Sequence, residues 1–243
     1  MKKFYLISMI LFISSSSFAQ DTSKVELNLG TDFVSRYVWR GTDYGRSPSI
    51  QPYMSATFGK FELGAWGAFT TNGLNIQETD LYLTYSISDA FSVTLFDYFF
   101  PDDALTMNNY FEYTNDKTGH IEELVVSFNG TKKIPLNLSI GTIIYGADKV
   151  NYYSLDEPDN TDLNFSTYIE LGYSGSIGNG TFNTFVGFTT HTGLYGEGFN
   201  VVNVGITGNK DVKLTEYFSL PLSCSIIFNP QKQNVFLVFG ISI

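Results

Sequence analysis

The sequence predicts an all-β protein, a closed antiparallel up-and-down transmembrane β-barrel of 12 strands. Apolar and polar residues alternate with a period of two through most of the chain, and short turn sequences alternate with longer connections. Hydrophobic residues make up 43% of the chain and charged residues only 16%, which excludes a disordered protein.

The first residues predict export. Lys2 and Lys3 precede a short apolar run, and Ser17-Phe18-Ala19 has the small-x-small pattern of a cleavage site. The apolar run is too short to cross a bilayer as a helix. We therefore expect a signal peptide at residues 1–19, cleaved after Ala19, and a barrel domain at residues 20–243.

Twelve segments carry the alternation, and most have the ~9–11 residues that a tilted strand needs to cross a bilayer. The expected strands are residues 25–38, 49–58, 61–70, 78–88, 91–100, 121–129, 135–146, 163–175, 180–190, 199–208, 214–228 and 234–243.

Every second connection is short and contains residues that favour tight turns, as at Gly59-Lys60 and Asn129-Gly130. The others are mostly longer, as at 101–120 and 147–162. This arrangement is typical of outer-membrane barrels, with both termini on the side of the short turns.

The two faces of each expected strand differ in charge. Apolar faces, such as Leu81, Leu83 and Tyr85, are almost free of charged residues, and Asp97 is the exception. Because a basic side chain facing lipid costs ~2–4 kcal/mol at mid-bilayer, and an acidic one less, we assign the apolar faces to lipid. The candidate lumen-lining residues are Asp32, Arg36, Glu62, Asp80 and Glu170, and the same alternation adds Glu26 and Glu216.

Two arginines close the first expected strand. Arg36 shares the inward face with Asp32, so we expect the two to pair. Arg40 follows Trp39, and we place it at the outer mouth, either near lipid headgroups or as an anion-binding group. Pro52 and Pro221 fall inside expected strands, where each removes a ladder hydrogen bond, so we expect a bulge or a strand boundary at both.

Three segments between residues 31 and 69 carry a resemblance: Thr31-Asp32-Phe33-Val34-Ser35-Arg36-Tyr37-Val38-Trp39-Arg40-Gly41, Pro48-Ser49-Ile50-Gln51-Pro52 and Phe61-Glu62-Leu63-Gly64-Ala65-Trp66-Gly67. Together they resemble the TorF family of porin-like exported proteins. The resemblance implies an outer-membrane barrel and suggests a channel, and it supplies no catalytic residues. Many outer-membrane barrels end on an aromatic residue, whereas this chain ends on Ile243.

Other candidate sites have simpler interpretations. The acidic loop 148–162 offers oxygen ligands for Ca²⁺, but it lacks the turn glycine of an EF-hand and contains Pro158, so we expect a solvated acidic loop. His120 and His191 fall beside long outer loops, and no Gly-x-Ser-x-Gly elbow accompanies them. The single cysteine, Cys224, is expected to face outward as a small apolar residue. We expect no catalytic residues, no metal site and no cofactor.

The sequence thus predicts an outer-membrane protein of a Gram-negative-type bacterium, a narrow passive channel for small hydrophilic solutes with a preference for cations. A non-conducting barrel that acts through its extracellular loops is the alternative, and a barrel lipid hydrolase or acyltransferase is a third interpretation. Expected partners are outer-membrane lipid and lipopolysaccharide, the barrel-assembly machinery during insertion, and small solutes. A formal charge of −10, with 14 basic and 24 acidic residues, argues against nucleic acid.

Overall fold

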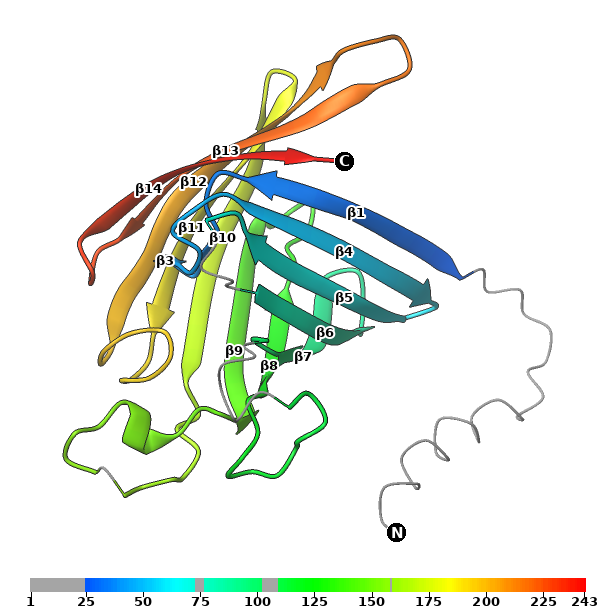
Figure 1. The fold of residues 1–243 in the computed structure, drawn as a ribbon. Helices are drawn as coiled ribbons and strands as arrows, with labels where there is room; N and C mark the ends of the chain where they lie inside the picture. Colours follow the sequence, from blue (N-terminus) through cyan, green and yellow to red (C-terminus); the bar gives the residue numbers. More distant parts are fainter. Residues whose placement is uncertain (1–24, 73–76, 102–108, 158) are drawn as a thin grey trace, which may run out of the picture.

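The computed structural model describes residues 25–72, 77–101, 109–157 and 159–243. They form a closed barrel of antiparallel strands (Figure 1), which confirms the predicted fold class. Within the described residues, no helix is long and apolar enough to cross a membrane. The expected export signal, residues 1–19, lies outside the described part of the chain.

Twelve strands make up the barrel, and each pairs with its neighbour in sequence until β1 closes the ring against β14. They are β1 (Glu26–Val34), β4 (Ser49–Phe58), β5 (Phe61–Thr70), β6 (Gln77–Ser86), β7 (Phe91–Tyr98), β8 (Ile121–Phe128), β9 (Leu136–Gly146), β10 (Thr167–Ile177), β11 (Gly180–Thr189), β12 (Asn200–Lys213), β13 (Ser219–Asn229) and β14 (Asn234–Ser242). A 3₁₀ turn, Val150–Tyr152, follows β9.

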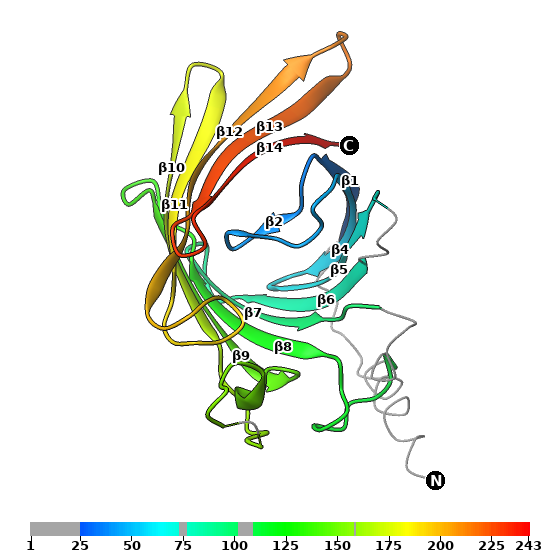
Figure 2. The same cartoon turned by 60° about the vertical axis from the view of Figure 1, so that its left-hand side comes forward.

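The expected first strand is too long. In the structure, β1 ends at Val34 and not at residue 38. Residues 35–48, which we call the inner hairpin, fold into the barrel instead of forming an outer loop. Two short strands, β2 (Val38–Trp39) and β3 (Thr42–Asp43), pair with each other there. Figure 2 shows β2 inside the ring of barrel strands.

The tip of the inner hairpin is a two-residue turn. Arg40 and Gly41 both have positive φ, at 48° and 77°, as a type I′ turn requires. A Cβ atom on Gly41 would collide with the carbonyl oxygen of Val202 on β12, so only glycine fits at this second position. Glycine at this position therefore allows the tip of the hairpin to pack closely against β12.

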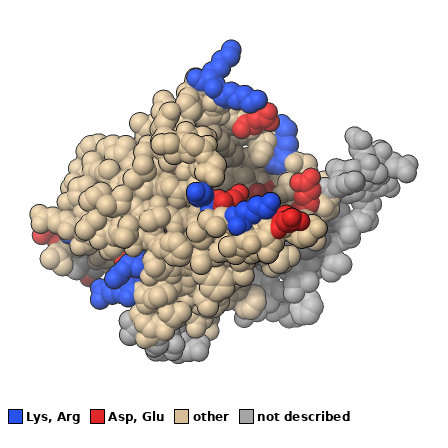
Figure 3. Space-filling model, turned by 90° about the horizontal axis from the view of Figure 1, so that it is seen from above, with Lys and Arg blue, Asp and Glu red and all other residues tan. Residues whose placement is uncertain are grey.

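Side chains alternate between the two faces of the barrel wall. Outward positions are apolar and exposed, as at Leu29, Leu63 and Leu237. Inward positions are polar and buried, as at Gln51 and Asp80. Figure 3 shows a hollow in one face of the molecule, with charged side chains beside it and large uncharged areas around it.

The two prolines behave differently from each other. The β4–β5 ladder lacks the pairs at Gln51 and Pro52, because proline has no N–H to donate. The register is the same on both sides of this gap. Pro221 pairs with Asp211 of β12 and lies outside the β13–β14 ladder. The described barrel has register shifts elsewhere: Ile144 of β9 is the extra residue opposite Glu122 and Glu123, and Val202 of β12 is the extra residue opposite Gly187 and Phe188.

Candidate functional site: the lumen and its inner hairpin

The inner hairpin is locked to the barrel wall by one ion pair. Arg40 Nη1 and Nη2 donate to Glu123 Oε1 and Oε2 on β8, at 2.6 and 2.9 Å. Two phenols complete the site: the Tyr195 hydroxyl donates to Oε1 at 2.6 Å and the Tyr98 hydroxyl to Oε2 at 2.8 Å. Because Glu123 is 0% exposed, these four donors replace the water that its carboxylate loses on burial.

Aromatic rings surround the guanidinium as well. The Cζ atom of Arg40 lies 4.4 Å from the ring centre of Trp39, 4.5 Å from that of Tyr168 and 4.7 Å from that of Tyr195. Such cation–π contacts favour a cation held among ring faces. They hold Arg40 in a defined position inside the barrel.

Two further features keep this cluster close-packed. A Cβ atom on Gly141 of β9 would collide with Glu123 Oε1, so the carboxylate occupies the space that a side chain would fill. Tyr195 comes from the connection between β11 and β12 and is 3% exposed. Burial raises the pKa of its hydroxyl well above the ordinary value, against the opposing effect of Arg40, so the phenol stays protonated and remains a donor.

The inner hairpin has anchors on other strands. The fully buried Asn229 of β13 donates its side-chain N–H to the carbonyl oxygen of Gly41 at 3.0 Å. On the opposite side, the Tyr37 hydroxyl donates to Glu78 Oε2 on β6 at 2.7 Å. Together with the Arg40–Glu123 pair, these contacts span the barrel from β6 through β8 to β13.

A cavity of about 450 Å³ adjoins the inner hairpin within the barrel. Tyr37, Trp39 and Arg40 of the hairpin form one side of it. Its remaining lining comes from strands β5 to β9: Trp66, Glu78, Asp80, Tyr82, Thr94, Phe96, Tyr98, Val125, Ser127 and Ser139. A smaller pocket of about 220 Å³ is lined partly by Glu170 and Asn183.

The two arginines of this region are not where the sequence analysis places them. Arg36 pairs with Asp43 at 2.5 Å, within the inner hairpin, and not with Asp32, because the chain leaves the β1 alternation after Val34. Arg40 lies inside the barrel and not at its outer mouth, because the turn at its tip carries it inward.

The candidate lumen acids differ in their burial, their hydrogen-bond partners and their positions on the strands. Asp80 is buried, Glu62 accepts a hydrogen bond from the Tyr82 hydroxyl at 2.9 Å, and Glu170 accepts one from Tyr168 and one from Asn203. Asp32 faces Gln51 of β4 across the ladder. Glu216 is not on a strand, because β12 runs on to Lys213 and leaves it in the exposed turn before β13. Glu26 is exposed at the start of β1.

The lumen-lining residues predicted from the sequence do not include Glu78 and Glu123, two acids that face the interior of the barrel. Glu78 shares the parity of Asp80 on β6, and Glu123 shares that of Ser127 on β8, so the alternation itself marks both as inward. No local signal connects Glu123 to Arg40, since the two residues are 83 positions apart.

Asp97, the acid on the apolar face, has its own partner. Its Oδ1 lies 2.6 Å from Nδ1 of His120, which is 0% exposed and stacks against Tyr113 at 4.2 Å between ring centres. The connection before β8 thus covers this acid on the outer wall.

His191 is hydrogen-bonded as well, with its ring nitrogens bonded to Thr190 Oγ1 and to the carbonyl oxygen of Asn164.

The acidic loop 148–162 is partly structural. Asp148 is fully buried and accepts hydrogen bonds from the backbone N–H and hydroxyl of Ser166, whereas Asp156, Glu157 and Asp162 are exposed. Pro158 lies outside the described residues. Among the residues that the structure describes, no group of three or more His, Cys, Asp or Glu side chains could hold a metal ion.

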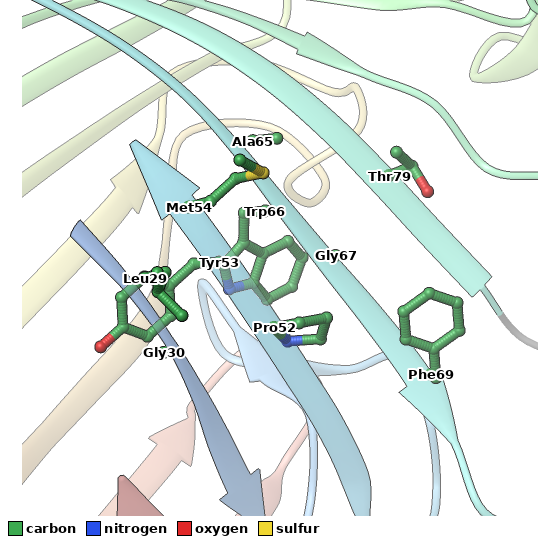
Figure 4. Close-up of a pocket in the computed structure, with 10 residues that line it drawn as sticks. All are labelled: Leu29, Gly30, Pro52, Tyr53, Met54, Ala65, Trp66, Gly67, Phe69 and Thr79. Carbon is green, nitrogen blue, oxygen red and sulfur yellow. The ribbon is translucent and has the colours of Figure 1, made fainter. Parts of the chain in front are cut away.

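The outer wall carries a hollow of about 450 Å³ where the β4–β5 ladder is interrupted (Figure 4). Pro52, Met54 and Phe69 line it together with Gly67, which has no side chain to fill the gap. Trp66 contributes to this hollow and also to the internal cavity. A single aromatic residue is therefore shared between the outer side of the wall and the lumen side.

These features define the class: a closed 12-strand antiparallel β-barrel whose interior is crossed by a hairpin inserted between its first two barrel strands. In comparisons with known proteins, no family model matches the chain and no curated protein matches it at a significant level. The resemblance to the TorF family stays a prediction.

Proposed function

We propose that the protein is an outer-membrane barrel that acts as a narrow passive channel for small hydrophilic solutes, with a preference for cations. The supporting observation is the contrast between an apolar, exposed outer wall and an interior that holds polar cavities. A water-soluble barrel has the opposite arrangement. The inner hairpin is the constriction of this channel, and we expect a small conductance while it is in place.

The proposal includes the setting of such a protein. Export by a cleaved signal peptide, insertion by the barrel-assembly machinery, and contact with outer-membrane lipid and lipopolysaccharide belong to it. It assigns no catalytic role and no cofactor to the chain. The TorF-like segments include the end of β1, the first half of the inner hairpin and parts of β4 and β5, and the resemblance they carry is to porin-like exported proteins.

One observation favours a second candidate, a non-conducting barrel that acts through its outer loops. At the level of the Arg40–Glu123 pair, Glu123, Ile143 and Val202 are each 0% exposed, so side chains fill this layer of the barrel. The two candidates differ in one measurable property, since only the first predicts ion current through the purified protein.

We expect the exported protein to fractionate with the outer membrane and to migrate differently on a gel before and after boiling in detergent. A closed barrel satisfies all its backbone hydrogen bonds internally, so it stays folded until heated. N-terminal mass analysis should find Gln20 first. Recovery of soluble protein from the periplasm without detergent would contradict the membrane assignment.

We expect the channel to select cations. Glu62, Glu78, Asp80 and Glu170 face the lumen without a basic partner among the described residues, whereas Arg40 is neutralised by Glu123. Carboxylates that line a pore attract cations and repel anions. The reversal potential across a KCl gradient should shift toward zero in Asp80→Asn and in Glu170→Gln. Glu216→Gln, in an exposed turn, is the matched control, and anion selectivity of the native protein would contradict the assignment.

A further inference from the structure

The cavity beside the inner hairpin contains two carboxylates that lack a counter-charge. Glu78 and Asp80 lie two positions apart on β6, both line the cavity, and each is 5% exposed. Tyr37 donates to Glu78, but Asp80 Oδ1 has no hydrogen-bond partner within the described residues. Buried carboxylates require charged or hydrogen-bonding partners, so this site is incomplete as it stands.

No basic side chain among the described residues pairs with either carboxylate. The ion pairs of the described residues are Arg36–Asp43, Arg40–Glu123 and His120–Asp97, and none includes Glu78 or Asp80. Arg40 lines the same cavity, but both of its terminal nitrogens are bound to Glu123. A bound cation, or a proton shared between the two neighbouring carboxyl groups, is therefore the remaining source of positive charge.

The other walls of the cavity indicate which kind of cation fits. Trp66, Tyr82 and Phe96 present aromatic rings, which bind alkylated ammonium groups through cation–π contacts. A bare metal ion fits less well, since no cluster of three or more metal-ligating side chains is found in the described part of the chain. The volume of about 450 Å³ is in the range of small-molecule sites.

We propose that this cavity binds a small organic cation, with its ammonium group against Glu78 and Asp80 and its alkyl groups against the rings of Trp66, Tyr82 and Phe96. The inference goes beyond the proposed function, because binding requires neither a membrane nor ion current. A barrel that binds the cation without conducting would disprove the channel and leave this site intact.

The experiment is titration calorimetry of the full barrel in maltoside micelles with choline as the probe. Its carbon isostere, in which a tert-butyl group replaces the trimethylammonium, is the uncharged comparison. We expect choline to bind and the isostere to bind about tenfold or more weakly, because charge-assisted contacts are lost. Asp80→Asn and Glu78→Gln should each weaken choline binding by a similar factor. Asp32→Asn is the matched control, since Asp32 does not line this cavity.

Folding of each variant is checked by its heat-dependent migration on a gel. If the β6 variants do not fold, Trp66→Leu and the comparison of choline with its isostere on the native protein still test the site. Equal binding of choline and the isostere, unchanged binding in both folded β6 variants, binding of Ca²⁺ or Mg²⁺ alone, or no binding of choline at millimolar concentration would each overturn the proposal.

Discussion

Replacing residues 35–48 with the dipeptide Asn-Gly should raise the single-channel conductance on the order of tenfold. The narrowest section of a pore limits its conductance, and the inner hairpin forms that section in the proposed channel. Without the hairpin, a barrel of 12 strands is wider than the eight-strand barrels that side chains fill. Val34 and Ser49 are paired across the β1–β4 ladder, so a two-residue turn can join them without disturbing either strand. The variant should also carry Glu123→Gln, which removes the carboxylate that Arg40 otherwise neutralises.

The matched control exchanges the connection 214–218 for the same dipeptide. Lys213 and Ser219 are likewise paired, but this turn is exposed and lies outside the lumen. We expect this control to conduct like the native protein in planar bilayers. If the variant without the inner hairpin folds and still carries no current, the channel proposal fails and the non-conducting barrel is favoured.

Arg40→Ala should lower the free energy of unfolding by about 3–5 kcal/mol, the usual cost of leaving one partner of a buried ion pair without the other. The Glu123 carboxylate would keep the two phenol donors of Tyr98 and Tyr195 but lose both guanidinium donors. The guanidinium contacts with Trp39, Tyr168 and Tyr195 would be lost as well. The measurement is denaturant unfolding of the refolded barrel, read from the midpoint and slope.

Arg36→Ala provides the comparison within the same hairpin. Its side chain is 45% exposed in the pair with Asp43, so we expect a loss of about 1 kcal/mol or less. Adding Glu123→Gln to Arg40→Ala should recover part of the stability, because the uncompensated charge is then absent. Equal losses in Arg36→Ala and Arg40→Ala would show that the Arg40–Glu123 pair does not hold the inner hairpin.

The sequence determines the strands well, because the alternation of side chains between the outer face of the barrel wall and the lumen is a local pattern with a period of two. The expected strands 49–58 and 61–70 agree with β4 and β5 at both ends. Larger differences occur beside the turns, as at β10, which begins at Thr167 and not at 163. There the alternation continues into a connection whose Leu163 bridges to Lys149, outside the β9–β10 ladder.

The sequence by itself thus determined the closed barrel, the number of its strands, and the parity that directs Asp80 inward. The same parity applies to Glu78 and Glu123, which the sequence analysis did not include among the lumen-lining residues. Only the tertiary structure decided that residues 35–48 fold inward and that Arg40 meets Glu123. The physical reason is that this ion pair, its tyrosine donors and the contact of Gly41 with Asn229 join residues far apart in the chain. A period-two pattern shows which face a side chain occupies, but it carries no information about partners across the lumen.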